Sequence, residues 1–446
     1  GTYNVHDPSC CKLGDYYYMY STDAILGENR KEAEEKNVPL GFIQVRRSKD
    51  LVKWEFVGWA FPEIPQEAVE WVRSHADGKG ATNIWAPYII PFGDKYRLYY
   101  CVSAFGLKTS YIGLAESASP EGPWMQRGCV VKTDATSVMN AIDPSIIADS
   151  ATGKWWMHYG SFFGGLYCVE LNPETGLPVQ EGDQGHLIAR RATYWKDNLE
   201  APEIIYNPEL KQYYLFVSYD PLMTTYNVRV GRSDKAEGPF VDYFGVELKD
   251  TTNNFPILTA PYRFNNHPGW AGTAHCAVFT SDEGQYFMAH QGRLSPHNQM
   301  MDLHLRQVFF TSDGWPVVSP ERYTGSASRK FSAADIVGEW EIIRVQEPAY
   351  ERQLQAGQIL WGEGQLKNEE WNVSCTLSLK KDGQLDENKG YWKFAERGQL
   401  LSLTLNGESV DNLLVFAGHD WENETETVLF TGLDSWGRSV WGKRTK

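Results

Sequence analysis

Three acidic residues stand at matching places in the chain and could together perform acid–base chemistry. Asp7, Asp143 and Glu200 lie nine, twelve and thirteen residues before the start of an aromatic-rich segment, and each has a Pro one or two positions later. Carboxyl groups held close together drive one another's pKa values apart, so that one stays ionised while another keeps its proton. A single Asp-Pro is more often the start of a turn than a catalytic residue. The shared placement is what favours a mechanism with paired carboxyl groups.

Two further residues occupy the same place before an aromatic-rich segment. Trp85 lies eleven residues before Tyr96, and His275 lies eleven residues before Tyr286. A histidine before an apolar run is most often a core residue, and only its register distinguishes His275. We therefore expect the three acids, Trp85 and His275 to line one central pocket.

The elements that position these residues form an internal repeat. Five segments share a turn with Gly or a charged residue followed by an aromatic strand: 14–20, 93–100, 153–159, 211–216 and 284–290. A strand, a tight polar turn and a short strand follow each segment, so that a unit of about 60 residues holds about four strands. Radial repetition of four-stranded units is typical of a β-propeller. We predict an all-β fold with five blades, in which the strand before each aromatic strand is innermost and begins at the axis.

The composition changes after Tyr323. Residues 325–328 form a linker-like run of Gly and Ser with one Ala, and residues 331–446 are rich in strands but lack the repeat. We predict a catalytic propeller over 1–325 and a small β-sandwich or β-barrel domain over 331–446. Two helical patterns, Asn29–Asn37 and Gln66–His75, are expected as insertions between strands.

The overall composition excludes several classes of protein. The chain has 446 residues and a net charge of -15, which argues against nucleic acid as a partner, and no apolar run is long enough for a transmembrane helix. The 17 Trp, 24 Tyr and 20 Phe suit an aromatic-rich β core and also sugar-binding platforms. The seven Cys form no CxxC pattern, which argues against structural zinc.

Taken together, the motifs resemble glycoside hydrolase family 43, a family of five-bladed β-propellers active on arabinan and xylan. The resemblance rests on His6-Asp7-Pro8, Trp85-Ala86-Pro87, Ile142-Asp143-Pro144-Ser145 and Glu200-Ala201-Pro202. Residues 159–165, Tyr-Gly-Ser-Phe-Phe-Gly-Gly, resemble a segment of its endo-α-1,5-L-arabinanase branch. Larger members of that branch carry a C-terminal β domain, which agrees with residues 331–446.

The resemblance implies an inverting mechanism and a role for each acid. Asp7 matches the general base, Glu200 the general acid, and Asp143 the carboxylate that orients the acid and tunes its pKa. Inversion needs room for a water, so the base and acid should lie roughly 6.5–9.5 Å apart. His275 matches a histidine close to a calcium ion, which we expect to be held mostly by water because calcium prefers oxygen ligands. One departure is Tyr88, where the family often has an acidic residue.

The expected activity is internal hydrolysis of α-1,5-linked arabinan by a monomeric enzyme. Candidate subsite aromatics are Trp85, Phe162, Phe163 and Trp195, and Phe163 stands where the branch frequently has Trp. The alternatives are an exo-acting α-L-arabinofuranosidase or β-xylosidase on the same fold and a carbohydrate-binding propeller without catalysis. No signal peptide is recognisable in this chain, yet we expect a secreted or cell-envelope protein because polymeric substrates do not readily enter cells.

Overall fold

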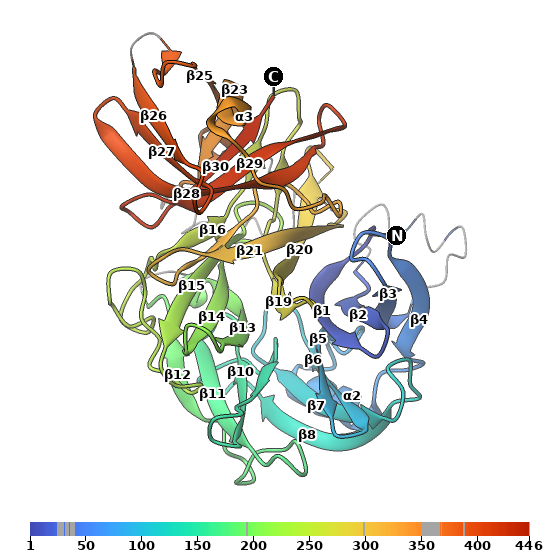
Figure 1. Ribbon diagram of the computed structural model, residues 1–446. Coiled ribbons are helices and arrows are strands. Elements are labelled where there is room, and N and C mark those ends of the chain that lie inside the picture. The colour runs from blue at the N-terminus through green and yellow to red at the C-terminus, as the bar shows by residue number, and fades with distance from the viewer. Residues whose placement is uncertain are drawn as a thin grey trace.

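The chain folds into β-sheets arranged around an axis, with a smaller β domain stacked on one side of them (Figure 1). The computed structural model describes residues 1–24, 31, 35, 41–192, 195–297, 299–348, 366, 368–386 and 389–445. The all-β prediction and the β-propeller are confirmed. The expected helix at Gln66–His75 is α2 with the same bounds, whereas most of the expected helix at Asn29–Asn37 lies outside the described residues. No helix in the described part of the chain is long and apolar enough to cross a membrane.

The aromatic-rich segments of the repeat form the second strand of each sheet. In the first repeat, a turn joins β1 (His6–Leu13) to β2 (Tyr16–Thr22), and the pairing runs to Leu13 opposite Tyr16. Gly14 has φ 61° in this turn, a left-handed conformation that glycine adopts at little cost. Gly14 therefore permits the tight turn that places the aromatic strand β2 antiparallel to β1, the strand that begins at the axis.

Four of the repeats form separate four-stranded antiparallel sheets among the described residues. The first holds β1, β2, β3 (Phe42–Ser48) and β4 (Glu55–Phe61). The second holds β5 (Trp85–Phe92), β6 (Lys95–Ser103), β7 (Ser110–Ser117) and β8 (Met125–Thr133). The third holds β9 (Ser145–Ala148), β10 (Trp155–Tyr159), β11 (Leu166–Leu171) and β12 (His186–Ala189). The fourth holds β13 (Leu199–Asn207), β14 (Gln212–Tyr219), β15 (Asn227–Ser233) and β16 (Ile257–Thr259).

The strands of the fifth repeat belong to a larger, seven-stranded sheet. Within it, β19 (Ala277–Thr280), β20 (Tyr286–Leu294), β21 (Asp302–Phe310) and β22 (Pro316–Val318) pair in chain order. The sheet also includes β17 (Tyr262–Arg263), β18 (Trp270–Ala271) and β24 (Asn372–Val373). The expected five separate blades are thus found as four, with the fifth repeat joined to strands from the preceding loop and from the C-terminal domain.

The propeller core lies between neighbouring sheets. One apolar cluster joins Tyr20 and Ile43 of the first sheet to Leu98 and Tyr100 of the second, and all four are almost fully buried. Burial of such a side chain stabilises the fold by about 1.5–3 kcal/mol. Because each sheet packs on its neighbours, the starts of the innermost strands are held at fixed positions around the axis.

The C-terminal domain is one antiparallel sheet of seven strands that curls around its own core. The order is β25 (Cys375–Leu379), β23 (Gly338–Arg344), β30 (Ser439–Arg444), β29 (Thr425–Leu433), β28 (Glu408–Asp420), β27 (Leu400–Leu405) and β26 (Gly390–Ala395). Trp340 of β23 and Trp392 of β26 share one apolar cluster although they lie far apart in this order. This curl favours the barrel over the sandwich. The short helices are α3 (Ala333–Ile336), η1 (Trp195–Asp197) and η2 (Asn368–Glu370).

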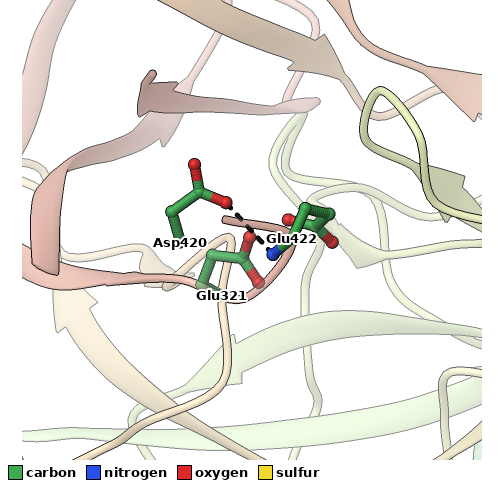
Figure 2. A group of neighbouring side chains, drawn as sticks. All are labelled: Glu321, Asp420 and Glu422. Carbon is green, nitrogen blue, oxygen red and sulfur yellow. Dashed lines mark hydrogen bonds between the residues drawn. The ribbon is translucent and has the colours of Figure 1, made fainter. Parts of the chain in front are cut away.

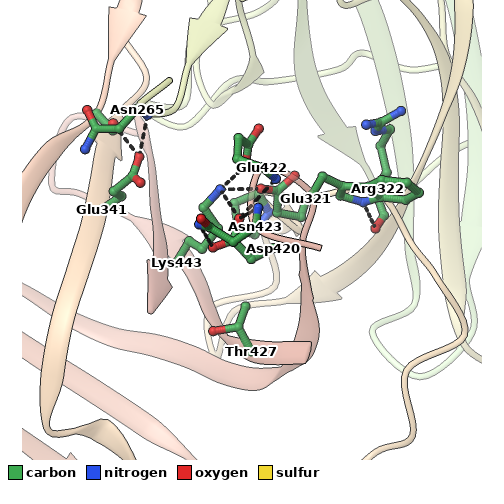
Figure 3. A network of polar contacts seen from close by, with 12 residues as sticks. Asn265, Glu321, Arg322, Glu341, Asp420, Glu422, Asn423, Thr427 and Lys443 are labelled. Carbon is green, nitrogen blue, oxygen red and sulfur yellow. Dashed lines mark hydrogen bonds and ion pairs between the residues drawn. The ribbon is translucent and has the colours of Figure 1, made fainter. Parts of the chain in front are cut away.

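A buried lysine fastens the C-terminal domain to the propeller. The Nζ of Lys443 on β30 lies 2.8 Å from Glu321 and 3.1 Å from Asp420, and it also pairs with Glu422. Figures 2 and 3 show the three carboxylates from both parts of the chain gathered at this point. Breaking the ion pairs of a buried ammonium with three carboxylates destabilises the fold, because removal of one partner leaves the other buried charges unpaired.

Candidate active site

A left-handed residue marks the axial start of each innermost strand. These residues are Asp7, Ala86, Asp143, Ala201 and His275, with φ of 49°, 42°, 57°, 55° and 55°. The strand pairing shifts register across this point in β1, β5 and β13. A non-glycine residue in this conformation is strained by about 1–2 kcal/mol, and such strain concentrates at functional sites. The backbone is therefore kinked at the same place in all five repeats.

This kink refines the register expected from the sequence. Asp7, Asp143 and His275 are themselves the left-handed residues, whereas Trp85 and Glu200 lie one position earlier, next to Ala86 and Ala201. The structural alignment of the repeats thus differs by one residue from the sequence alignment for two of the five. The reason is that equivalent positions in the five repeats are defined by the left-handed backbone conformation, which the residue types do not reveal directly.

The five residues that the sequence places at the axis converge on one cavity of about 540 Å³. All three acids line it, together with Trp85, Phe162, Phe163 and His275. The side chain of the remaining candidate, Trp195, lies outside the described residues. Other lining residues that sequence reasoning missed are His6, Thr22, Asp23, Asn83, Phe105, Leu107, Ser161, Lys196, Leu222, Met223 and Gln299.

Asp7 is surrounded by groups that keep it ionised. His275 Nδ1 lies 2.8 Å from one carboxylate oxygen, and the Thr22 hydroxyl donates to the other at 2.8 Å. Burial would raise the pKa of Asp7, but the charges of His275 and His6 and these contacts lower it well below its usual range. The same partnership raises the pKa of His275 to about 9, against the lowering effect of its burial. Asp7 is therefore a carboxylate near neutral pH.

Glu200 experiences the opposite environment. Burial raises its pKa, and the negative charge of Asp7 acts in the same direction. Tyr226 donates to one oxygen at 2.5 Å and Ser161 donates to the other at 2.7 Å, and these two bonds partly offset the increase. One cavity therefore holds a carboxyl group with a raised pKa and another with a lowered pKa. A general acid needs the first property and a general base needs the second.

Asp143 is tied to the backbone next to Glu200. Its Oδ2 accepts the N–H of Ala201 at 3.1 Å, and the residue is almost fully buried. Burial raises the pKa of Asp143 well above its usual range, and the charges of Glu200 and Asp7 add to this increase while His275 opposes it. Asp143 is thus placed to influence both the position and the pKa of Glu200.

Aromatic side chains form part of the cavity wall. Trp85 meets Phe105 edge to face, with ring centroids 6.3 Å apart, and Phe105 is 43% exposed. The ammonium of Lys196 lies 4.3 Å from the centre of the Phe163 ring. Phe162 is buried, and its backbone N–H donates to Leu199 O at 2.7 Å, so it supports the cavity wall. Phe105 was missed because it lies in a loop between β6 and β7, outside the repeated motifs.

The fit of calcium at His275 can be judged from the ligands around it. His275 offers one imidazole, whose Nδ1 is engaged with Asp7. Within the described ranges, one group of three potential metal-ligating side chains lies within 4.8 Å of one another, and it consists of Glu321, Asp420 and Glu422 at the domain interface. There the ammonium of Lys443 already supplies the positive charge. The protein groups at His275 do not by themselves form a calcium cage.

A carboxylate and a carboxyl group with a raised pKa, which line one cavity together with aromatic rings, are the arrangement of a glycoside hydrolase. The chain belongs to glycosyl hydrolases family 43, whose model matches residues 2–316. Residues 320–442 match the C-terminal lipocalin-like domain that accompanies the family.

Relatives over the full length support this assignment. The chain is 29% identical to the extracellular endo-α-(1→5)-L-arabinanase of Thermotoga petrophila over 99% of this chain and 94% of that protein. It is 25% identical to extracellular endo-α-(1→5)-L-arabinanase 2 of Bacillus subtilis over 99% and 93% of the two chains. The crystal structure of the endo-1,5-α-L-arabinanase from Thermotoga petrophila superimposes with a TM-score of 0.82 at 27% identity, covering 100% of this chain and 99% of that one.

Proposed function

We propose that the protein is an endo-acting arabinanase that hydrolyses internal α-1,5-L-arabinofuranosidic bonds with inversion. The observation that carries the proposal is the pair Asp7 and Glu200, which line one cavity with pKa values displaced in opposite directions. The full-length similarity to two endo-arabinanases supports the choice of substrate and of internal cleavage. We also propose that β19–β22 act as the fifth blade, since His275 at its start completes the cavity.

In the proposed reaction Asp7 is the general base and Glu200 the general acid. Asp7 accepts a proton from a water that attacks the anomeric carbon from the side opposite the leaving group. Glu200 donates its proton to the oxygen of the leaving sugar as the glycosidic bond breaks. Asp143, bonded to the backbone beside Glu200, keeps the acid oriented. Thr22 and His275 hold the Asp7 carboxylate in place.

The other parts of the proposal concern the surroundings of the site. The extracellular relatives support secretion, and the family matches support catalysis by the propeller within residues 1–325 with an accessory domain over 331–446. A water-coordinated calcium ion near His275 and a monomeric state remain predictions.

The product profile on linear 1,5-arabinan tests the proposal. Endo cleavage predicts oligosaccharides of intermediate length early in the reaction, and Asp7→Ala should abolish them. Arabinose alone from the first time point would instead establish an exo-acting enzyme. No product from arabinan or xylan would favour a carbohydrate-binding propeller, although the presence of all three acids argues against that alternative.

A further inference from the structure

A series of hydrogen bonds joins neighbouring sheets around the axis just beyond the kinked residues. The acceptor is a side chain that lies two positions after the left-handed residue of its own sheet. The donor is a backbone N–H of the next sheet, three positions after the left-handed residue there. These bonds are Ile89 N to Ser9 Oγ at 3.1 Å, Ile204 N to Ser145 Oγ at 3.1 Å, and Val278 N to Glu203 Oε1 at 2.9 Å. In the fifth repeat the equivalent residue is Ala277, whose side chain has no acceptor. We call these three bonds the axial belt.

Glu203 differs from the other members of the belt because it joins three sheets. Its Oε1 accepts from Val278 on β19, and its Oε2 accepts the hydroxyl hydrogen of Ser145 on β9 at 2.9 Å. The side chain is buried and both oxygens are used as acceptors. A buried carboxyl group with two donors on two different sheets fixes the distance between those sheets and its own.

The three strands joined by Glu203 begin near Asp143, Glu200 and His275. Ser145 follows Asp143 by two residues, Glu203 follows Glu200 by three, and Val278 follows His275 by three. Since β9, β13 and β19 start at these points, a displacement of one strand at the belt moves the acid or its partners. A misplacement of about 1 Å at a reacting group can reduce turnover by about 100-fold.

We propose that Glu203 is a positioning residue that sets the placement of Glu200 relative to Asp143 and to the Asp7–His275 pair. This inference rests on the proposed hydrolase function. Glu203 does not line the cavity, and it acts on the placement of the catalytic groups through the strands that it joins. Trp85 and Phe105 belong to the second sheet, to which Glu203 makes no hydrogen bond, so their part of the cavity wall should keep its shape.

The test compares Glu203→Ala and Glu203→Gln with a matched control. Glu341 at the domain interface is equally buried and accepts the same kinds of donor, the N–H of Asn265 and the hydroxyl of Ser374, each at 2.7 Å. We expect Glu203→Ala to lower kcat on linear arabinan about 10- to 100-fold while KM changes less than about threefold. Glu341→Ala should destabilise the fold comparably and retain the wild-type kcat.

The glutamine variant separates placement from charge. An amide can accept from Val278 and donate to the Ser145 oxygen, so Glu203→Gln should keep kcat within about threefold of wild type. Ser145→Ala removes one of the two contacts and should cause an intermediate loss if Glu203→Ala does not fold. A kcat unchanged in both Glu203→Ala and Ser145→Ala would overturn the inference. Equal losses of kcat in Glu203→Ala and Glu341→Ala would also overturn it, and so would equal losses of kcat in Glu203→Ala and Glu203→Gln. Failure of the wild type to release product would instead refute the proposed function.

Discussion

Replacing Tyr226 by Phe should change the pH profile of the enzyme without removing its catalytic carboxyl groups. The Tyr226 hydroxyl donates to Glu200 at 2.5 Å and favours the carboxylate form, so its loss raises the pKa of Glu200 further. A hydrogen bond to a charged acceptor contributes about 1.5–3 kcal/mol, compared with about 0.5–1.5 kcal/mol for a neutral pair. The difference of about 1–1.5 kcal/mol corresponds to a shift of about one unit in the pKa of Glu200.

The sign of the effect follows from the role of Glu200 as a proton donor. The acid is active while protonated, so activity falls as the pH rises through the pKa of Glu200. In Tyr226→Phe the basic limb of kcat/KM should therefore move about one unit to higher pH. The measurement is kcat/KM on a linear arabino-oligosaccharide across the pH range, followed by reducing-end release.

A second tyrosine provides the control for this experiment. Tyr213 donates to the buried carboxylate of Asp149 at 2.6 Å, away from the cavity. Tyr213→Phe removes an equivalent bond and should leave the basic limb where it is in the wild type. An unmoved limb in Tyr226→Phe, or one that moves to lower pH, would refute the assignment of Glu200 as the acid.

Three further predictions concern other parts of the molecule. Lys443→Met should lower the free energy of unfolding, measured in urea, by about 3–5 kcal/mol because it leaves buried carboxylates unpaired. Lys154→Met removes an exposed ion pair and should lower it by at most about 1 kcal/mol. Equal effects would contradict the role of Lys443 in joining the two domains. Phe105→Ala should raise KM for arabino-oligosaccharides about tenfold with kcat nearly unchanged, as expected for loss of uniform binding, and a loss confined to kcat would argue against a sugar platform. The predicted calcium near His275 should be detected as bound Ca²⁺ by elemental analysis of protein purified in the presence of Ca²⁺; protein without bound metal under that condition would exclude the predicted calcium.

The fold was largely predictable because its signals are local and repeated. The aromatic second strands and their turns occur five times, and the helix at Gln66–His75 has a clear amphipathic pattern. The joining of the fifth repeat to β17, β18 and β24 was not predictable. It depends on Asn372 pairing with Tyr262 across more than a hundred residues of sequence, and no periodic pattern encodes such a contact.

The site was predictable where it follows the repeat and unpredictable elsewhere. Asp7, Asp143 and His275 share a kinked backbone position that the repeat identifies. Tyr226 donates to Glu200 and Thr22 donates to Asp7. Thr22 is the last residue of β2 and Tyr226 immediately precedes β15, and both positions face the axis only after folding. The presence of Pro after four of the kinked positions was the available signal for the backbone geometry, and it would have corrected the register of Trp85 and Glu200.

The most direct test of the central claim is the anomeric configuration of the first product. Wild-type enzyme acting on a linear α-1,5-linked arabino-oligosaccharide can be followed by ¹H NMR before mutarotation. Water activated by Asp7 and a leaving group protonated by Glu200 predict that the β-anomer forms first. Initial formation of the α-anomer would mean retention through a covalent intermediate and would contradict the roles assigned to both residues.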